Sequence, residues 1–454
     1  MDSISVTNKR FTSFHLIMIA IISVDSLRNL PIVAQYGFSL ISFYVIAALF
    51  FFLPLAWITS RLAVQFTQGG GAFLWIEAAF GSRWRYISLS LVWIYNIIWY
   101  PTIFAFISNI LLSLIAPELE YNKTLILLTC ALLFWLITFM HFFGVRMSHW
   151  LSTVSAIVGT LIPMFLMVFM VFYWLSVGLT PAIDMHWSKL LPDTHVMHNI
   201  AYFSNFLFSL LGLEVIAMYA PYVRQPEKAY PKALLISSFS ILLLLIVSSL
   251  CLCIVIPPEK ISLLGGIIDV FRQFFGSTFP TGAFIVGICI VIGSLGMASS
   301  WIIGLVLGLH TALAASFPKQ FFAKLNKNGV PIRLLLLQGV IYSLILNGFL
   351  LLPNINSAYW LFSALTAQFA LIYYVLLFAA AFKLLFHAAT KNLTLSVLDK
   401  ALPLLAVFIS FIGLLAGLIP PEDIQATHRG LYIYTTGGSL LFFVLLLIML
   451  KKKR

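Results

Sequence analysis

Long apolar runs separated by short polar segments cover most of this chain. A helix needs about 20 apolar residues to cross the hydrocarbon core of a bilayer. The runs of that length are, approximately, 11–37, 39–66, 84–116, 124–143, 149–178, 197–222, 231–256, 279–315, 331–352, 356–387, 401–419 and 430–450. The pattern predicts an all-α integral membrane protein with 12 transmembrane helices.

The connections between these runs are short. The longest expected outside segments, at about 179–197 and 257–278, could each hold a short surface helix. No linker or soluble domain interrupts the pattern of spans. We therefore expect a single transmembrane domain that covers residues 1–454.

Lysine and arginine residues flank the apolar runs unevenly. Cytoplasmic loops of membrane proteins carry an excess of both residues. If the N-terminus is cytoplasmic, most of the 26 lysines and arginines fall in cytoplasmic connections, and so does the basic run at 451–454. We therefore expect a multi-pass protein of the cell inner (plasma) membrane with both termini in the cytoplasm.

Composition supports this interpretation and limits the choice of partners. Hydrophobic residues make up 62% of the chain, charged residues only 9%, and the mean hydropathy is +1.05. Soluble proteins carry about 25% charged residues, so the apolar excess must face the lipid bilayer. The net charge of +12 is explained by basic cytoplasmic loops, and no loop is long enough to form a basic domain. We therefore expect no nucleic acid partner.

The chain lacks the residue patterns of an enzyme, a metal protein or a channel. Cys130, Cys251, Cys253 and Cys289 all lie inside apolar runs, without the spacing of metal ligands. No intramembrane histidine has a carboxylate partner in the sequence, so no acid–base pair for catalysis is evident. A channel would need rings of ligands, which symmetry usually supplies. We therefore expect no cofactor, no metal and no enzymatic activity.

Three charged residues lie at membrane depth in the predicted spans: Asp25, Arg28 and Glu214. A charge at the centre of a transmembrane helix costs about 3 kcal/mol on insertion scales, so such a residue usually has a function or a partner. Arg28 suits an anionic substrate group, because a guanidinium binds a carboxylate in a bidentate way. It can equally pair with Asp25 or Glu214, or point into the inner vestibule. For Asp25 the alternatives are binding of an amine and neutralisation of Arg28, and we favour neutralisation.

Two spans contain residues that break helices. The first span reads SVDSLRNLP at 23–31, and its proline disfavours a helical conformation of the preceding residue. The sixth span contains Gly212, which permits unwound backbone. Non-helical backbone at membrane depth is tolerated where it lines a cavity. We therefore expect two broken helices, whose free N–H and C=O groups suit the carboxylate and ammonium groups of a zwitterionic amino acid.

The two breaks are five spans apart. Corresponding broken helices in the two halves of a transporter are the best sequence pointer to its binding site. We therefore predict two inverted five-helix repeats, at about 11–178 and 197–387, in a LeuT-like arrangement. Two appended helices follow at about 401–450.

Three segments carry a resemblance to a known family. The segment 208–234, FSLLGLEVIAMYAPYVRQPEKAYPKAL, contains in order Phe208, Gly212, Glu214, Arg224, Pro226 and Pro231. The segments GGGAFLWIEAAFGSRW at 69–84 and HTALAASFPKQFFAKLNKNGVP at 310–331 are also similar to that family. With these motifs the chain resembles the amino acid–polyamine–organocation (APC) superfamily. DSLRNLP at 25–31, followed by AQYGFS, resembles its bacterial glutamate/γ-aminobutyrate antiporter-like branch.

The resemblance implies a secondary active transporter of amino acids or closely related metabolites. Transport would proceed by exchange or be proton-linked, with alternating access around broken helices 1 and 6. Some proton-coupled relatives carry a lysine in the fifth span, where this chain has Gly159, and this favours exchange. The alternative is an ion-coupled symporter of a non-amino-acid solute, such as an amine or a nucleobase. The expected partners are a small-molecule substrate, the lipid bilayer and, in a homodimer, a second copy of the chain.

The breaks and the resemblance together define the candidate site. The expected substrate-binding residues are Asp25, Ser26, Leu27, Arg28, Asn29, Asn96, Ser209, Leu211, Gly212, Leu213, Ser300 and Ser363. The expected gating or coupling residues are Phe208, Glu214, Tyr95 and Trp301. For the polar residues of the third, eighth and tenth spans, the alternative is hydrogen bonding between helices.

Overall fold

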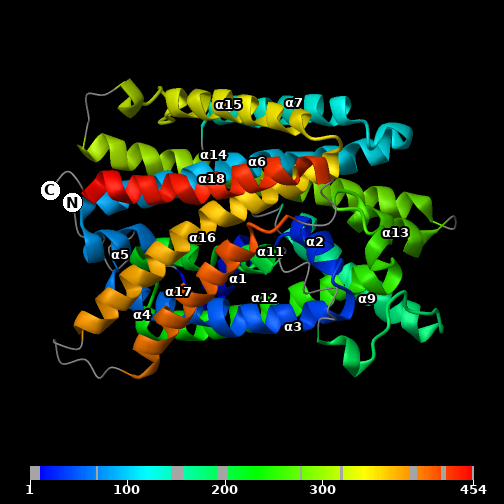
Figure 1. Cartoon of the computed structure of the whole chain (residues 1–454), viewed down its shortest axis with the longest axis horizontal. Helices are drawn as coiled ribbons and strands as arrows, with labels where there is room; N and C mark the ends of the chain where they lie inside the picture. Colours follow the sequence, from blue (N-terminus) through cyan, green and yellow to red (C-terminus); the bar gives the residue numbers. More distant parts are fainter. Residues whose placement is uncertain are drawn as a thin grey trace.

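The computed structural model describes residues 11–67, 70–144, 155, 157–191, 203–276, 279–316, 321–388, 396–420 and 426–451. These residues form helices joined by short turns (Figure 1). The α-helices are α1 Ser13–Val24, α2 Leu30–Ala34, α3 Leu40–Ala47, α4 Leu53–Gln65, α5 Gly71–Phe80, α6 Ser82–Ile115, α7 Lys123–His141, α9 Ile162–Ser176, α11 Phe203–Ser209, α12 Pro226–Val255, α13 Gly266–Phe275, α14 Pro280–Ser316, α15 Ile332–Leu346, α16 Ile355–Ala388, α17 Leu398–Ala416 and α18 Ala426–Lys451. The all-α architecture expected from the sequence is confirmed.

Ten helical segments of the described chain are long and apolar enough to cross a membrane. The number rises to 11 if Ser13–Val24 and Leu27–Ala34, which bend by 41°, count as one span. The run expected at 430–450 lies in α18, which is not among them. Parts of the runs expected at 149–178 and 197–222 lie outside the described residues. The count of 12 therefore stays a prediction.

Several helices carry large apolar side chains on an exposed face. On α7, Leu128, Leu132 and Leu136 are each more than half exposed, and they recur every fourth residue. On α9, Phe165 and Phe169 are similarly exposed and four residues apart. Residues four apart share one face of a helix. Such continuous apolar faces are the surfaces expected to contact lipid.

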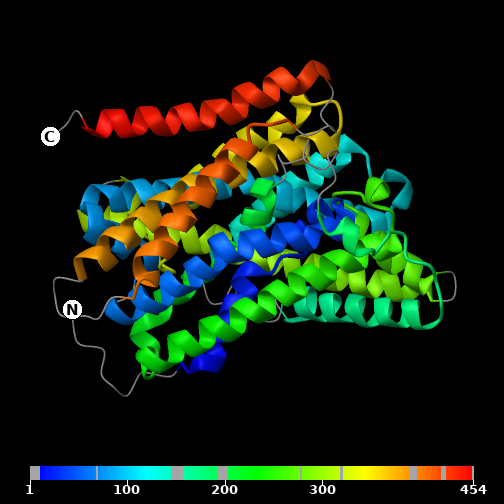
Figure 2. The same ribbon diagram turned by 60° about the horizontal axis from the view of Figure 1, so that its bottom comes forward.

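Helices α6 and α16 pass through the interior of the bundle. Helix α6 packs against α5, α7, α14 and α16, and α16 also packs against α11 and α17. Figures 1 and 2 show α18 along the outside of the bundle, next to α16. Side chains of α6 and α16 can therefore meet the two spans that were expected to be broken.

The first span is interrupted directly after α1. Helix α1 ends at Val24, and Asp25 and Ser26 have extended backbone, with ψ angles of 121° and 120°. A short 3₁₀ turn, Leu27–Asn29, then leads into α2. Pro31 lies in the first turn of α2. Backbone N–H groups in the first turn have no partner within the helix, so the missing N–H of proline costs no hydrogen bond there.

The sixth expected span is interrupted at Gly212. Helix α11 ends at Ser209, and a 3₁₀ segment, Leu213–Tyr222, follows Gly212. Gly212 has a φ of +105°, and a Cβ atom there would lie 2.8 Å from the carbonyl oxygen of Ser23. Only glycine therefore fits at this position, because any side chain would strain the backbone at this φ angle and would clash with the Ser23 carbonyl oxygen.

Helix α1 runs antiparallel to the segment Leu213–Tyr222. At one end the Phe11 N–H donates to the Tyr222 carbonyl at 3.0 Å, and the Arg224 N–H donates to the Phe11 carbonyl at 2.9 Å. At the other end α1 meets Gly212. These contacts bring the two interruptions together although they are nearly 190 residues apart in the chain.

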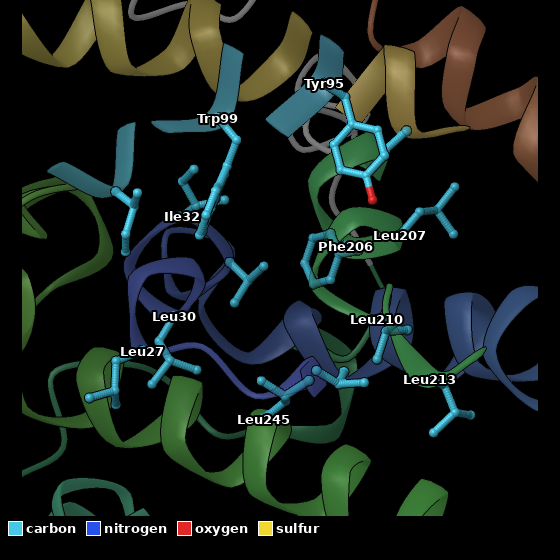
Figure 3. Packing of buried hydrophobic residues seen from close by; sticks show 14 of the residues in the cluster. Leu27, Leu30, Ile32, Tyr95, Trp99, Phe206, Leu207, Leu210, Leu213 and Leu245 are labelled. Atoms are coloured by element: carbon cyan, nitrogen blue, oxygen red, sulfur yellow. The ribbon is translucent and has the colours of Figure 1, made fainter. Parts of the chain in front are cut away.

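Apolar side chains pack around the two interruptions (Figure 3). Leu27 and Leu30 point toward α12, where Leu245 lies. On the other side Tyr95 of α6 faces Phe206 and Leu207 of α11. All of these side chains are buried. The polar groups of the breaks therefore lie in an apolar environment.

A glycine pair provides a test of this packing. A Cβ atom at Gly293 of α14 would overlap Gly159 of the π-helical segment Ile157–Leu161. We expect Gly293→Ala to destabilise the fold by about 1–3 kcal/mol, the usual range for overpacking. Gly304→Ala, on the same helix, is the control, because no described atom lies within 4 Å of a Cβ placed there. Thermal unfolding in detergent measures both, and equal melting temperatures would contradict the packing.

Candidate substrate-binding site

The Arg28 side chain is buried between the first span and two neighbouring helices. One terminal nitrogen, Nη1, donates to Thr102 Oγ1 of α6 at 2.8 Å and to the hydroxyls of Tyr359 and Ser363 of α16 at 3.3 and 3.5 Å. The other, Nη2, donates to Asn29 Oδ1 at 2.8 Å. The side chain is 2% exposed. The interruption of the first span thus places a guanidinium in the interior of the bundle.

All of these hydrogen-bond partners of Arg28 are neutral. No carboxylate among the described residues forms an ion pair with it, and its Nε atom has no described hydrogen-bond partner. The rings of Trp99, Phe208 and Tyr359 lie 5.6–5.9 Å from its Cζ atom. Aromatic faces stabilise a cation partly, but a buried charge usually has a counter-charge. Within the described residues the guanidinium thus has neutral and aromatic neighbours but no carboxylate partner.

Asp25 does not neutralise Arg28. Neither of its carboxylate oxygens has a hydrogen-bond partner within the described structure, although the residue is only 2% exposed. The ion pair that we favoured from the sequence is therefore wrong for this conformation. Arg28 points toward α6 and α16, whereas Asp25 interacts electrostatically with Tyr44 of α3. The extended backbone between the two residues allows their side chains to diverge.

Glu214 is bound at the second interruption. Its Oε2 atom accepts a hydrogen bond from the Tyr374 hydroxyl at 2.7 Å. The same hydroxyl accepts the Gly212 N–H at 2.9 Å. Tyr374 of α16 therefore satisfies a backbone donor and a carboxylate of the break at once. This arrangement gives Glu214 a structural role, and its expected coupling role stays a prediction.

The other expected gating residues lie at different distances from Arg28. Phe208 contacts the guanidinium with its ring. Trp301 packs edge-on against Trp99, with ring centroids 6.5 Å apart, and Trp99 in turn faces Arg28. Tyr95 lies opposite α11 in Figure 3. Phe208 is therefore the gating candidate that the structure brings directly to the arginine.

Three expected polar residues bond mainly to their own helices. Asn96 donates to the Val92 carbonyl, Ser209 to the Phe206 carbonyl and Ser300 to the Gly296 carbonyl, at 2.8–3.0 Å. None of them is among the described contacts of Arg28. Ser26 has a buried hydroxyl without a described partner, Leu213 is fully buried and Leu211 is partly buried. Asn29 and Ser363 are thus the expected polar residues that reach the guanidinium.

Sequence reasoning missed three residues that contact Arg28: Thr102, Tyr359 and Trp99. Thr102 follows Pro101, where α6 loses a backbone donor. Tyr359 precedes Ser363 by four residues, so both lie on one face of α16. That spacing was the available signal for Tyr359. The described residues contain no group of three His, Cys, Asp or Glu side chains that could hold a metal ion.

Comparison with known proteins identifies the family. The sequence model of the amino acid permease family matches residues 10–446. This chain belongs to the amino acid permease family. The expected membership of the APC superfamily is thereby confirmed, and so is the similarity to its antiporters.

Curated relatives of this permease match over most of its length. An uncharacterised transporter of Legionella pneumophila is 37% identical over 436 residues, which cover 94% of this chain and 93% of the relative. A probable agmatine/putrescine antiporter of Lactococcus lactis is 26% identical over 379 residues, covering 83% of this chain and 80% of its own. A glutamate/γ-aminobutyrate antiporter of the same species is 23% identical over 447 residues, covering 94% and 87%.

A solved structure shows the fold of this permease. The crystal structure of MhsT in complex with L-phenylalanine matches with a TM-score of 0.57 at 16% sequence identity. The match covers 88% of this chain and 98% of MhsT. The permease therefore has a LeuT-like fold, and its family and fold are those of membrane transporters.

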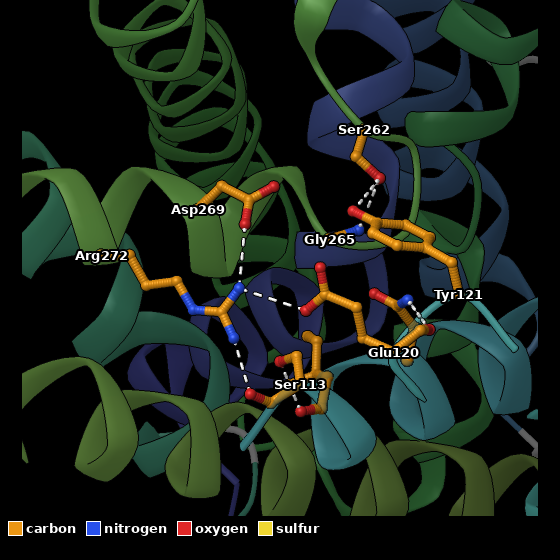
Figure 4. A network of polar contacts seen from close by, with 9 residues as sticks. Ser113, Glu120, Tyr121, Ser262, Gly265, Asp269 and Arg272 are labelled. Carbon is orange, nitrogen blue, oxygen red and sulfur yellow. Dashed lines mark hydrogen bonds and ion pairs between the residues drawn. The ribbon is translucent and has the colours of Figure 1, made fainter. Parts of the chain in front are cut away.

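A second polar network joins α13 of the permease to the end of α6 (Figure 4). Arg272 of α13 donates to Glu120 Oε2 at 3.2 Å, to Asp269 Oδ1 at 3.3 Å and to the Ser113 carbonyl at 2.6 Å. Burial raises the pKa of Asp269 to about 6, although the Arg272 charge opposes this rise and Glu120 adds to it. Helix α13 also contacts α2, so the network connects α6 to the first interrupted span.

The raised pKa of Asp269 predicts that acid favours docking of α13. The pKa of Asp269 is higher when α13 is docked than the ordinary value of 3.8. The carboxyl group therefore binds a proton more tightly in the docked state. Docking is therefore strongest below about pH 4 and weakens as the pH rises to about 6. We expect Asp269→Asn to remove this dependence. Hydrogen exchange of residues 266–275, corrected for the intrinsic effect of pH, measures it.

The control for this prediction is Glu259→Gln. Glu259 is exposed and takes part in none of the ion pairs in the described part of the chain. This variant should keep the pH dependence of the wild type. An unchanged dependence in Asp269→Asn would show that Asp269 is not the titrating group.

The bridge made by Tyr374 predicts a loss of stability in Tyr374→Phe. The substitution leaves the Gly212 N–H and the Glu214 carboxylate without this partner, and an unsatisfied buried group costs about 1–3 kcal/mol. The neighbouring Tyr373→Phe is the control, because the Tyr373 hydroxyl makes none of the described hydrogen bonds although its side chain is buried. Thermal unfolding should show a larger decrease for Tyr374→Phe. An equal decrease would argue against the bridge.

Proposed function

We propose that this transporter exchanges amino acids or closely related metabolites across the plasma membrane, and that Arg28 binds an anionic group of the substrate. The observation that carries the proposal is a buried guanidinium that has only neutral partners among the described residues. Guanidinium groups match carboxylates in geometry and charge. A substrate carboxylate would therefore supply the missing counter-charge.

The geometry of the two interruptions supports alternating access around them. Unwound segments at membrane depth supply backbone groups for a substrate in secondary transporters. In this proposal α1 with α2, and α11 with the segment Leu213–Tyr222, are the broken helices of two inverted repeats, at about 11–178 and 197–387. The appended helices at about 401–450 complete a single domain with 12 spans and cytoplasmic termini.

The relatives support the substrate class and the mode of transport. Two of them are named as antiporters, one for glutamate and γ-aminobutyrate, the other for agmatine and putrescine. All four named substrates carry an amine on a short chain, and glutamate and γ-aminobutyrate carry a carboxylate as well. We propose Phe208, whose ring covers the Arg28 guanidinium, as the gate on this site.

Counterflow in proteoliposomes tests this proposal. Vesicles are loaded with one unlabelled amino acid at a time, and uptake of labelled glutamate, γ-aminobutyrate, arginine and leucine is followed. Stimulation by an internal amino acid is expected for an exchanger. If vesicles with folded protein show no stimulation by any amino acid, the proposal fails and an ion-coupled symporter of another solute takes its place.

Arg28→Lys tests the role of the arginine. Lysine keeps the charge but loses the bidentate geometry, and a hydrogen bond to a charged group contributes about 1.5–3 kcal/mol. We expect the apparent affinity to fall about ten- to a hundredfold. Arg61→Lys is the control, because Arg61 is paired with Asp399 at 3.2 Å and is 41% exposed. Unchanged affinity in an active Arg28→Lys transporter would show that Arg28 does not bind the substrate.

A further inference from the structure

The carboxylate of Asp25 is the second charged group at the first interruption, and it takes part in no described hydrogen bond or ion pair. Its side chain is 98% buried, and neither oxygen has a hydrogen-bond donor within the described residues. A buried carboxyl group without a partner is costly to ionise, and a cation beside it favours the ionised form. A buried polar group that makes no hydrogen bond in a folded protein requires an explanation other than stability.

Hydroxyl groups belong to the residues that can be related to Asp25, either directly or through Tyr44. The adjacent Ser26 hydroxyl is buried without a described partner, and so is the hydroxyl of Ser249 on α12. The Tyr44 hydroxyl on α3 lies beside both Ser209 and Ser249 and interacts electrostatically with Asp25. Carboxylate and hydroxyl oxygens are the kinds of group that accept hydrogen bonds from a cation or coordinate it.

Asp25 and Arg28 are close in the chain but face different neighbours. Two residues separate them, so their Cα atoms lie no more than about 10 Å apart. Arg28 is held by α6 and α16, whereas Asp25 interacts electrostatically with Tyr44 of α3. The interruption therefore presents a carboxyl group and a guanidinium a short distance apart, without an ion pair between them.

We propose that Asp25 binds the ammonium group of the substrate while Arg28 binds its anionic group. This inference rests on the proposed function and makes it more specific. A solute with one group of each sign neutralises both buried charges at once. A solute with two amines would leave Arg28 unpaired, and one with two carboxylates would leave Asp25 unpaired. The transporter therefore selects zwitterionic solutes against diamines and dicarboxylates of similar length.

Competition in the counterflow assay tests this assignment. Whichever of labelled glutamate, γ-aminobutyrate, arginine and leucine is exchanged is competed with γ-aminobutyrate and leucine, and with the deaminated and decarboxylated analogues of these two, each of which keeps a single charged group. Asp25→Asn should weaken the binding of the amino acid and of its decarboxylated amine at least tenfold. Competition by the deaminated acid should stay unchanged. Arg28→Gln should show the reverse pattern, because the deaminated acid retains the carboxylate. This opposite response is not expected if both residues have only structural roles.

Other outcomes separate the possible failures. If no amino acid is exchanged by wild type, the proposed function fails. A second outcome is that exchange occurs and Arg28→Gln behaves as expected, but Asp25→Asn weakens the binding of all ligands equally or of none. In that case only the Asp25 assignment fails. An inorganic cation would instead be indicated by sodium-dependent uptake that Asp25→Asn makes sodium-independent, with amine competition unchanged. That result would also overturn the ammonium assignment.

A second pair of variants keeps the test valid if Asp25→Asn does not fold. Ser249→Ala removes a hydroxyl beside Tyr44 and should weaken amine-bearing ligands about two- to fivefold, the loss of one neutral hydrogen bond. Ser238→Ala is its control, since Ser238 is on the same helix and is also buried without a described partner. Equal affinities for amine-bearing ligands in these two variants would overturn the assignment.

Discussion

The contact between Gly212 and the end of α1 determines the geometry of the interior. The Ser23 carbonyl oxygen occupies the space that a side chain at position 212 would need. This contact brings the interruptions of two distant spans together, and it fixes where the segment after Ser23 begins. Backbone polar groups at membrane depth must find partners within the protein. Tyr374 provides such a partner, since its single hydroxyl bonds both to the Gly212 N–H and to Glu214.

Two other arginines of the described chain meet opposite charges. Arg61 pairs with Asp399 at 3.2 Å, and the arginine of α13 contacts two carboxylates. Arg28 and Asp25 are more deeply buried than either of these arginines, yet neither is in an ion pair with a described residue. Unpaired buried charges raise the free energy of the folded state. Their presence side by side at one interruption is therefore better explained by binding than by stability.

The features that the bilayer imposes could be predicted from the sequence, and those that depend on helix packing could not. Span length and the depth of Asp25 and Arg28 follow from hydropathy, because lipid excludes charge. The expected ion pair between them was wrong because residues three apart are neighbours on a helix, whereas here the backbone at Asp25 is extended. Thr102 and Tyr359 were missed because a lone hydroxyl in an apolar run does not show which neighbouring helix it will face. Ser363 was among the predicted site residues, and it lies near Arg28. Tyr359 lies four residues before it on the same face of α16, so this spacing would have indicated Tyr359 as well.

The arrangement of the charges also bears on the mode of transport. Alternating access requires the protein to return from one side of the membrane to the other. With a zwitterion bound, Arg28 and Asp25 would both have partners while the site is closed to both sides, whereas without a substrate the guanidinium would be enclosed in a low-dielectric interior without a counter-charge. In the proposed mechanism the return of the unloaded protein is therefore slow, and the return with a second substrate molecule is fast. In that mechanism this difference would be the physical basis of obligatory exchange, and it would arise from the same unpaired groups that are proposed to select the substrate.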